Sequence, residues 1–286
     1  MQTLRRAVQD AAATGTNSVG ESYRYISLLE TIKLTEDLQL ARRAIEIAAL
    51  EADIIPERYQ RNLGTIGTAG QIRLLHACVG VLGAGGLGGL VLELLARMGV
   101  GRLVVVDGDF FSDSNLNRQL LATERTVQES KTETALRRIN EINGSVEVKA
   151  FSCRGELSNL AKMFSGCDLV IDCLDNLSSR FDLEETCRQL GIIMVHGAIA
   201  GMLGQLAVIR PDRPLLSFIY GPLTENGAQR GVEILLGNPA STPAMLASWQ
   251  VNEAVKILAG LEGVLPPDRL LIIDMQSGES YSVQLA

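Results

Sequence analysis

Residue types that metal sites and nucleophilic catalysis need are scarce in this chain. It has only two histidines, His76 and His196, and neither has a close partner of the kind that a metal site requires. None of its five cysteines forms a CxxC pair, so a four-ligand structural zinc site is not expected. No serine–histidine–aspartate or cysteine–histidine set presents itself either.

Long runs of one character are also missing. No basic run accompanies the net charge of −7, and nucleic acid is therefore not expected as a partner, because phosphate backbones require clustered lysine and arginine. No apolar run reaches the about 20 residues of a membrane span. No apolar signal core follows the basic start of the chain, so a cytoplasmic protein is expected.

The chain of 286 residues is long enough for one large α/β domain or two small ones, and 47% hydrophobic residues exclude general disorder. Residues 1–55 differ from the rest. A small, polar stretch from Thr14 to Ser22 predicts a loop, and helical periodicity from Leu38 to Ala52 predicts a helix. We interpret 1–55 as an N-terminal helical extension, with Pro56 at its joint to a main domain over 56–286.

The main domain opens with a strand–turn–helix pattern. Cys78 to Leu82 predicts a buried strand, Leu87 to Met98 a buried helix, and Leu103 to Val106 a second strand. Further strands are expected over 146–151, 169–173 and 192–196, and helices over 131–142 and 179–190. This alternation predicts an α/β fold, a Rossmann-like, doubly wound and mostly parallel sheet.

The pattern changes after Gly197. Apolar segments over 203–210, 270–275 and 280–285, separated by tight turns, predict antiparallel strands at the C-terminal edge of the sheet. A helix is expected from Pro243 to about Gly260. Residues 211–242, between the strand over 203–210 and this helix, show little periodicity. A long irregular stretch inside a compact domain is usually functional or mobile.

A glycine-rich turn joins the first strand to its helix. Gly83, Gly85, Gly86 and Gly88 form a GxGxxG pattern. Glycine lets the backbone approach phosphates closely, and the following helix offers free N–H groups at its N-terminus. The pattern alone does not identify the nucleotide, but its position between strand and helix predicts a phosphate site.

Asp107 ends the second strand about twenty residues past the turn, where a carboxylate can accept hydrogen bonds from a ribose. NAD and ATP both contain a ribose, so Asp107 leaves both cofactors open.

Three further polar positions distinguish the two cofactors. Arg118, Lys131 and Asp175 with Asn176 all follow strands whose carboxyl ends border one crevice. Cations there would stabilise a leaving pyrophosphate, and Asp175 is a hard-oxygen ligand for Mg²⁺. Each residue alone has an ordinary structural interpretation, as a solvated charge or a helix cap. Together they favour ATP with a metal ion, used to adenylate a carboxylate.

The order and spacing of these motifs resemble the MoeB/ThiF/HesA family, the bacterial relatives of the ubiquitin-activating enzymes. The resemblance covers about residues 57–286. The motifs that carry it are RYQRN at 58–62, GAGGLG at 83–88, DGD at 107–109, SNLNRQ at 114–119, Lys131 and DCLDN at 172–176.

This resemblance implies an enzyme that binds ATP and Mg²⁺ and adenylates the C-terminal glycine of a small ubiquitin-like protein, such as a sulfur carrier, or of a peptide. It also implies a homodimer with shared active sites, because Arg61 resembles an arginine that reaches into the partner's site. Arg61, Arg118, Lys131 and Asp175 would be catalytic. The nucleotide-binding residues that it implies are Gly83, Gly85, Gly86, Gly88, Asp107, Asp109, Ser114, Asn115, Asn117, Arg118, Lys131, Asp175 and Asn176, with Asp175 on the metal.

The sequence departs from the family in three places. The two CxxC pairs of zinc-holding relatives are missing, one of them near Ser217 to Tyr220, and no zinc is expected. Residues 211–242 contain no cysteine, so the protein's own chemistry should end at the acyl-adenylate. Residues 1–55 are an extension that shorter relatives lack, suited to binding the substrate or strengthening the dimer.

Other functions stay open at this point. A nicotinamide- or flavin-dependent oxidoreductase also uses a glycine-rich turn. A degenerate subunit of a heterodimeric activating enzyme would lack the charged residues, which argues against it here. A relative that activates a small-molecule carboxylate, or one carried by tRNA, is a further alternative, and the shortage of positive charge disfavours the tRNA case.

Overall fold

The computed structural model describes residues 2–16, 19–222 and 233–285. In this part of the chain the main sheet has eight strands in the order β11-β10-β9-β8-β7-β4-β5-β6. They are β4 (Cys78–Leu82), β5 (Arg102–Val106), β6 (Glu147–Phe151), β7 (Leu169–Asp172), β8 (Ile193–Ala200), β9 (Leu203–Ile209), β10 (Arg269–Asp274) and β11 (Glu279–Gln284).

Strand direction divides this sheet into two parts. β6, β5, β4, β7 and β8 pair in parallel, whereas β9, β10 and β11 pair antiparallel at one edge. The predicted doubly wound, mostly parallel sheet with antiparallel C-terminal edge strands is therefore confirmed. All five residues of β4 are buried, as expected of a central parallel strand that is covered on both faces.

Helices cover both faces of the sheet. α4 (Gln60–His76), α5 (Gly88–Met98), α6 (Lys131–Ile142) and α11 (Ser241–Ala259) pack on one face, and α7 (Leu157–Met163), α8 (Leu177–Leu190) and α9 (Leu216–Tyr220) on the other. Alternate residues of β4 feed the two cores, because Val79 and Val81 join the first and Cys78 and Leu82 the second. Two 3₁₀ turns, η1 (Glu57–Tyr59) and η2 (Asp113–Asn115), and the short α10 (Glu233–Leu236) complete this domain.

The strand order reverses beside β4. The chain proceeds outward from β4 through β5 to β6, and then returns to β7 on the other side of β4. A crevice outside the carboxyl ends of the strands at such a reversal is where doubly wound sheets bind ligands.

The N-terminal residues form a small unit of their own. It contains α1 (Gln2–Ala11), β1 (Ala13–Thr16), β2 (Ser22–Ile26), α2 (Leu28–Leu38), α3 (Arg42–Glu51) and β3 (Ile55–Pro56). The strands form a sheet in the order β1-β2-β3, and the helices pack around a separate hydrophobic cluster that includes Val8, Ile26 and Ile45.

This unit differs in part from the predicted helical extension. The predicted helix is present as α3, but α1, α2 and three strands were missed. Both ends of the predicted Thr14–Ser22 loop lie in strands, and residues 17 and 18 lie outside the described residues. The strands are two to five residues long, which is too short for a sequence pattern to distinguish them from a loop.

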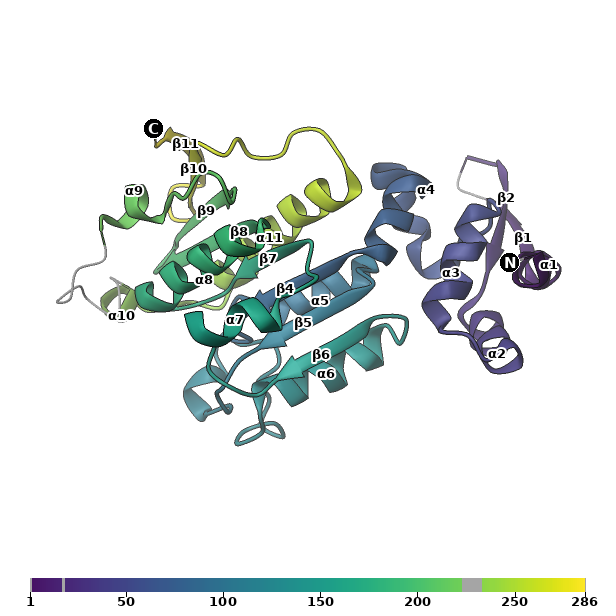
Figure 1. Cartoon of the computed structure of the whole chain (residues 1–286), viewed down its shortest axis with the longest axis horizontal. Helices are drawn as coiled ribbons and strands as arrows, with labels where there is room; N and C mark the ends of the chain where they lie inside the picture. Colours follow the sequence, from purple (N-terminus) through teal and green to yellow (C-terminus); the bar gives the residue numbers. More distant parts are fainter. Residues whose placement is uncertain (1, 17–18, 223–232, 286) are drawn as a thin grey trace.

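A buried polar junction attaches this unit to the main domain. The Tyr59 hydroxyl donates to Glu46 of α3 at 3.1 Å and accepts from the Asn143 amide at 2.9 Å. Figure 1 shows the N-terminal unit beside α4 at one end of the molecule, with the parallel strands pointing away from it. No helix among the described residues is long and apolar enough to cross a membrane.

Candidate nucleotide site

The glycine turn connects β4 to α5 in a tight backbone arrangement. Gly83 has φ +95°, and its N–H donates to Val106 O on β5 at 2.9 Å. A side chain at Gly83 would meet the Cys173 carbonyl, and one at Gly88 would overlap the Gly83 carbonyl. These two glycines are therefore needed by the turn itself, whereas a Cβ on Gly86 would meet nothing nearer than 3.6 Å. Gly86 is a place where the backbone is open to a ligand.

Asp107 fixes the turn from the neighbouring strand. Its carboxylate accepts from Ala84 N at 2.7 Å and from Asp109 N at 2.8 Å. Burial raises the pKa of Asp107, although Lys131 and the two backbone N–H groups act in the opposite direction. The sequence placed Asp107 near a ribose, and the structure adds that it holds the glycine turn against the end of β5.

Lys131 is the first residue of α6, and Ser130 caps this helix through its side chain. Only 8% of the Lys131 side chain is exposed, and its Nζ lies 3.0 Å from an Asp109 carboxylate oxygen. The Asp109 side chain itself is 74% exposed. The two predicted residues therefore form one ion pair, which is linked to the turn through Asp107.

The segment from Ser114 to Gln119 lies against the turn. The Arg118 Nη1 donates to Ser114 O and to the Asn117 side chain, both at 2.9 Å. A Cβ on Gly86 would stand 3.7 Å from Arg118 Cγ. Gly86, Asn117 and Arg118 together line a cavity of about 330 Å³. Arg118 is thus placed at the turn, as predicted. Asn115 is the last residue of η2, and its side chain completes the capping box of this turn by accepting from Ser112 N at 3.1 Å.

Gln119 was not predicted as a site residue, although the sequence pattern contains it. Its side chain is 7% exposed, and its Oε1 is buried without a hydrogen-bond partner among the described residues. The amide nitrogen lies 3.5 Å from where a Cβ on Gly85 would stand. A buried amide beside an open glycine backbone is suited to a polar ligand. The only sequence signal was its place directly after Arg118.

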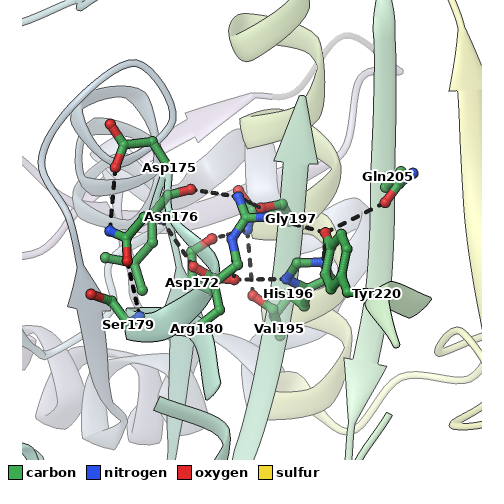
Figure 2. A network of polar contacts seen from close by, with 12 residues as sticks. Asp172, Asp175, Asn176, Ser179, Arg180, Val195, His196, Gly197, Gln205 and Tyr220 are labelled. Atoms are coloured by element: carbon green, nitrogen blue, oxygen red, sulfur yellow. Dashed lines mark hydrogen bonds and ion pairs between the residues drawn. The ribbon is translucent and has the colours of Figure 1, made fainter. Parts of the chain in front are cut away.

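Asp175 and Asn176 follow β7 at the same edge of the sheet. The Asn176 side chain caps α8 by accepting from Ser179 N at 2.9 Å, and its amide contacts Asp175 at 3.5 Å (Figure 2). Because the Cys173 carbonyl lies against Gly83, this loop is adjacent to the glycine turn. The Asp175 side chain is exposed.

The loop after β7 offers one carboxylate, that of Asp175, to a magnesium ion. The described residues contain no group of three or more histidine, cysteine or acidic side chains that could hold a metal alone. Mg²⁺ in nucleotide sites is typically held by one or two carboxylates together with phosphates and water. An exposed Asp175 beside a phosphate-binding turn fits that donor set.

Arg61 lies far from these residues. It is exposed on α4, next to Asn62, whose amide donates to Gln71 at 3.0 Å, and Gln71 donates in turn to Met98 O at 2.9 Å. Met98 ends α5, an 11-residue helix that starts at the turn and spans about 16 Å at 1.5 Å per residue. The structure does not bring Arg61 to its own crevice, so a role in catalysis requires a second copy of the chain.

A second cavity, of about 370 Å³, lies between the loop after β6 and the first turn of α8. It borders the carboxyl edge of the sheet, and sequence reasoning assigned none of its residues. The residues that line it are Arg154, Gly155, Glu156, Leu157, Ser158, Ser178, Ser179 and Asp182.

The comparison with protein families matches residues 59–286 to the ThiF family. The chain belongs to this family. The SAMP-activating enzyme E1 of Haloferax volcanii is 37% identical over 225 residues, covering 76% of this chain and 81% of the relative. The sulfur carrier protein adenylyltransferase of Thermus thermophilus is 36% identical over 220 residues, covering 72% and 78%. The family predicted from the motifs is confirmed.

Other ThiF-family relatives are longer proteins. Adenylyltransferase and sulfurtransferase MOCS3 of Drosophila yakuba is 34% identical over 251 residues, and the match covers 87% of this chain but 54% of the relative. The chain therefore spans about half the length of this relative. Among solved structures, E. coli MccB with AMPCPP and MccA superposes with a TM-score of 0.68 at 17% identity, covering 96% of this chain and 95% of MccB. At this identity the likeness concerns the fold, and it extends over the N-terminal unit.

Proposed function

We propose that this protein is an ATP- and Mg²⁺-dependent adenylyltransferase. It activates the C-terminal carboxylate of a small ubiquitin-like protein or peptide as an acyl-adenylate and releases pyrophosphate. The observation that carries the proposal is the convergence of the glycine turn, Asp107, Arg118, Lys131 and Asp175 at one edge of the sheet in a ThiF-family chain. Each of these groups would bind a phosphate, a ribose or a metal ion.

The reaction needs alignment and charge neutralisation more than proton transfer. A carboxylate oxygen of the substrate attacks the α-phosphorus, and the bond from that phosphorus to the β-phosphate oxygen breaks with its electron pair. The carboxylate is already ionised at neutral pH and requires no general base. Arg118 and Lys131 stabilise the negative charge that gathers on the leaving pyrophosphate.

Asp175 would hold the metal ion together with phosphate oxygens. When bound, Mg²⁺ neutralises phosphate charge and orients the phosphate chain for displacement. Lys131 is paired with Asp109 at 3.0 Å, so binding of ATP would place phosphate in competition with Asp109 for this ammonium group.

The substrate class rests on the names of the relatives. One activates SAMP and another adenylates a sulfur carrier protein, which supports a small protein with a C-terminal glycine. We also propose a homodimer in which Arg61 of each copy serves the other copy's site. A cytoplasmic location stays a prediction. So does the expectation that the protein's own chemistry ends at the adenylate, which rests on the lack of cysteine in residues 211–242.

Nucleotide selectivity tests this proposal against an oxidoreductase. ATP with Mg²⁺ should raise the thermal midpoint, because a ligand that binds only the folded state stabilises it. NAD at the same concentration should leave the midpoint unchanged. Stabilisation by NAD and not by ATP would contradict the proposal and favour the oxidoreductase.

A further inference from the structure

A buried polar network lies directly beneath the Asp175 loop. It joins Asp172 at the end of β7, His196 on β8, Arg180 on α8 and Tyr220 at the end of α9 (Figure 2). His196 Nδ1 lies 2.7 Å from an Asp172 carboxylate oxygen, and His196 Nε2 lies 3.0 Å from the Tyr220 hydroxyl. Asp172 and His196 are fully buried, and Arg180 is 7% exposed.

The contacts fix the direction of the hydrogen bonds. Burial lowers the pKa of His196, although Asp172 raises it, so the ring is neutral and donates from Nδ1 to the carboxylate. Its Nε2 then accepts from the Tyr220 hydroxyl at 3.0 Å, which is shorter than the contact of this hydroxyl with its other acceptor, Gln205 Oε1, at 3.5 Å. The Tyr220 oxygen accepts from Arg180 Nη1 at 3.0 Å. One orientation of protons therefore serves the Arg180 Nη1, Tyr220 and His196 contacts together, while Arg180 Nε lies 3.6 Å from an Asp172 carboxylate oxygen.

Asp172 and Arg180, at the two ends of this network, both hydrogen-bond the backbone of Leu174. Leu174 N–H donates to the second Asp172 oxygen at 2.9 Å, and Arg180 Nη2 donates to Leu174 O at 2.6 Å. Leu174 is the residue directly before Asp175. With its N–H and C=O both fixed, the path of the chain into Asp175 is set by the buried side chains of Asp172 and Arg180.

We propose that Tyr220, His196 and Arg180 are positioning residues that set the place of Asp175. The proposal rests on the proposed function, since Asp175 is there the metal ligand. The simpler interpretation is a network that only ties α8, β8 and α9 together. The two hydrogen bonds to Leu174 favour positioning, because they act on the loop and not on the packing of these elements.

Tyr220→Phe is the mildest test, because it removes one hydroxyl and keeps the ring. Arg180 Nη1 and His196 Nε2 each lose a part-buried hydrogen-bond partner, and one such bond is worth roughly tenfold in an equilibrium constant. Hydrogen–deuterium exchange of the Leu174 amide should therefore become about tenfold faster. Affinity for a non-hydrolysable ATP analogue, measured by calorimetry, should fall about tenfold with Mg²⁺ and little without it.

Thr186→Val is the matched control, and it lies on α8, the helix that carries Arg180. It removes one buried hydroxyl, which donates to Asp182 O within α8 at 2.7 Å. We expect this variant to leave the exchange of Leu174 and the Mg²⁺-dependent affinity within about twofold, because the hydrogen bond that it removes lies within α8 and does not involve Leu174.

The outcomes separate the two proposals. Unchanged Leu174 exchange in Tyr220→Phe, or an equal change in Thr186→Val, would overturn the positioning role. If wild-type protein binds the ATP analogue no better with Mg²⁺ than without it, the proposed function fails instead. In that case faster Leu174 exchange in Tyr220→Phe alone would still support the positioning of this loop.

Discussion

Alanine at Gly86 and alanine at Gly88 should have opposite consequences. The two glycines are two residues apart in the same turn, but their surroundings differ. A Cβ on Gly86 meets nothing nearer than 3.6 Å, and its φ is not in the left-handed region. A Cβ on Gly88 would stand 2.7 Å from the Gly83 carbonyl carbon and closer still to the oxygen.

Gly86→Ala should therefore fold with a free energy of unfolding within about 1 kcal/mol of wild type. Its methyl group would occupy the space in which a phosphate approaches the backbone. Loss of one charge-assisted hydrogen bond costs roughly 1.5–3 kcal/mol, so affinity for ATP should fall about tenfold to a hundredfold. Gly88→Ala should instead lose about 1–3 kcal/mol of stability or more, since the backbone must move.

Denaturant unfolding and calorimetric titration with a non-hydrolysable ATP analogue measure both quantities on each variant. Wild-type affinity in Gly86→Ala would refute a phosphate at this backbone. Wild-type stability in Gly88→Ala would refute the close contact between Gly83 and Gly88.

Three further predictions concern other parts of the chain. Asp175→Ala should abolish ATP–pyrophosphate exchange and keep the fold, because it removes an exposed side chain that we propose as the metal ligand and no core packing; near wild-type exchange would remove Asp175 from the mechanism. Arg61→Ala should be inactive alone, yet mixing it with Asp175→Ala should restore some exchange if the arginine acts in trans, and no recovery in mixed dimers would count against shared sites. Burial raises the pKa of Glu46 above its ordinary 4.5 more than Arg58 lowers it, so the unfolded chain releases this proton at lower pH than the folded protein does. The contribution of Glu46 to the free energy of unfolding should therefore decline as pH rises above 4.5, so wild type should lose stability relative to Glu46→Gln over that range; parallel pH profiles from denaturant titrations would contradict this.

The central sheet could be predicted because its strands are buried on both faces. Cys78–Leu82 and Lys131–Ile142 have the predicted bounds, since an apolar run before a glycine turn and a Ser130 cap mark their ends. The N-terminal sheet could not be predicted in the same way. Its strands are only two to five residues long, so tertiary contacts and not local pattern determine them.

The candidate site likewise has features that the sequence predicts and features that it does not. The glycine turn, Asp107, Arg118 and Asp175 follow strand ends, so the rule for parallel sheets places them at one edge. The side-chain contacts between elements could not be predicted. The contact of Asp107 with Ala84, the ion pair of Lys131 with Asp109, and the place of His196 beneath the Asp175 loop depend on the packing of α6 and β8.

ATP–pyrophosphate exchange tests the central claim most directly. The protein, ATP, Mg²⁺ and labelled pyrophosphate are incubated with small proteins that end in Gly-Gly, and each is compared with the same protein carrying a C-terminal amide. We predict label in ATP with at least one free carboxylate substrate and none with its amide, because only the free carboxylate can form an acyl-adenylate. Exchange that is equal with the amide, or label incorporation without any carboxylate substrate, would contradict adenylation of a C-terminus.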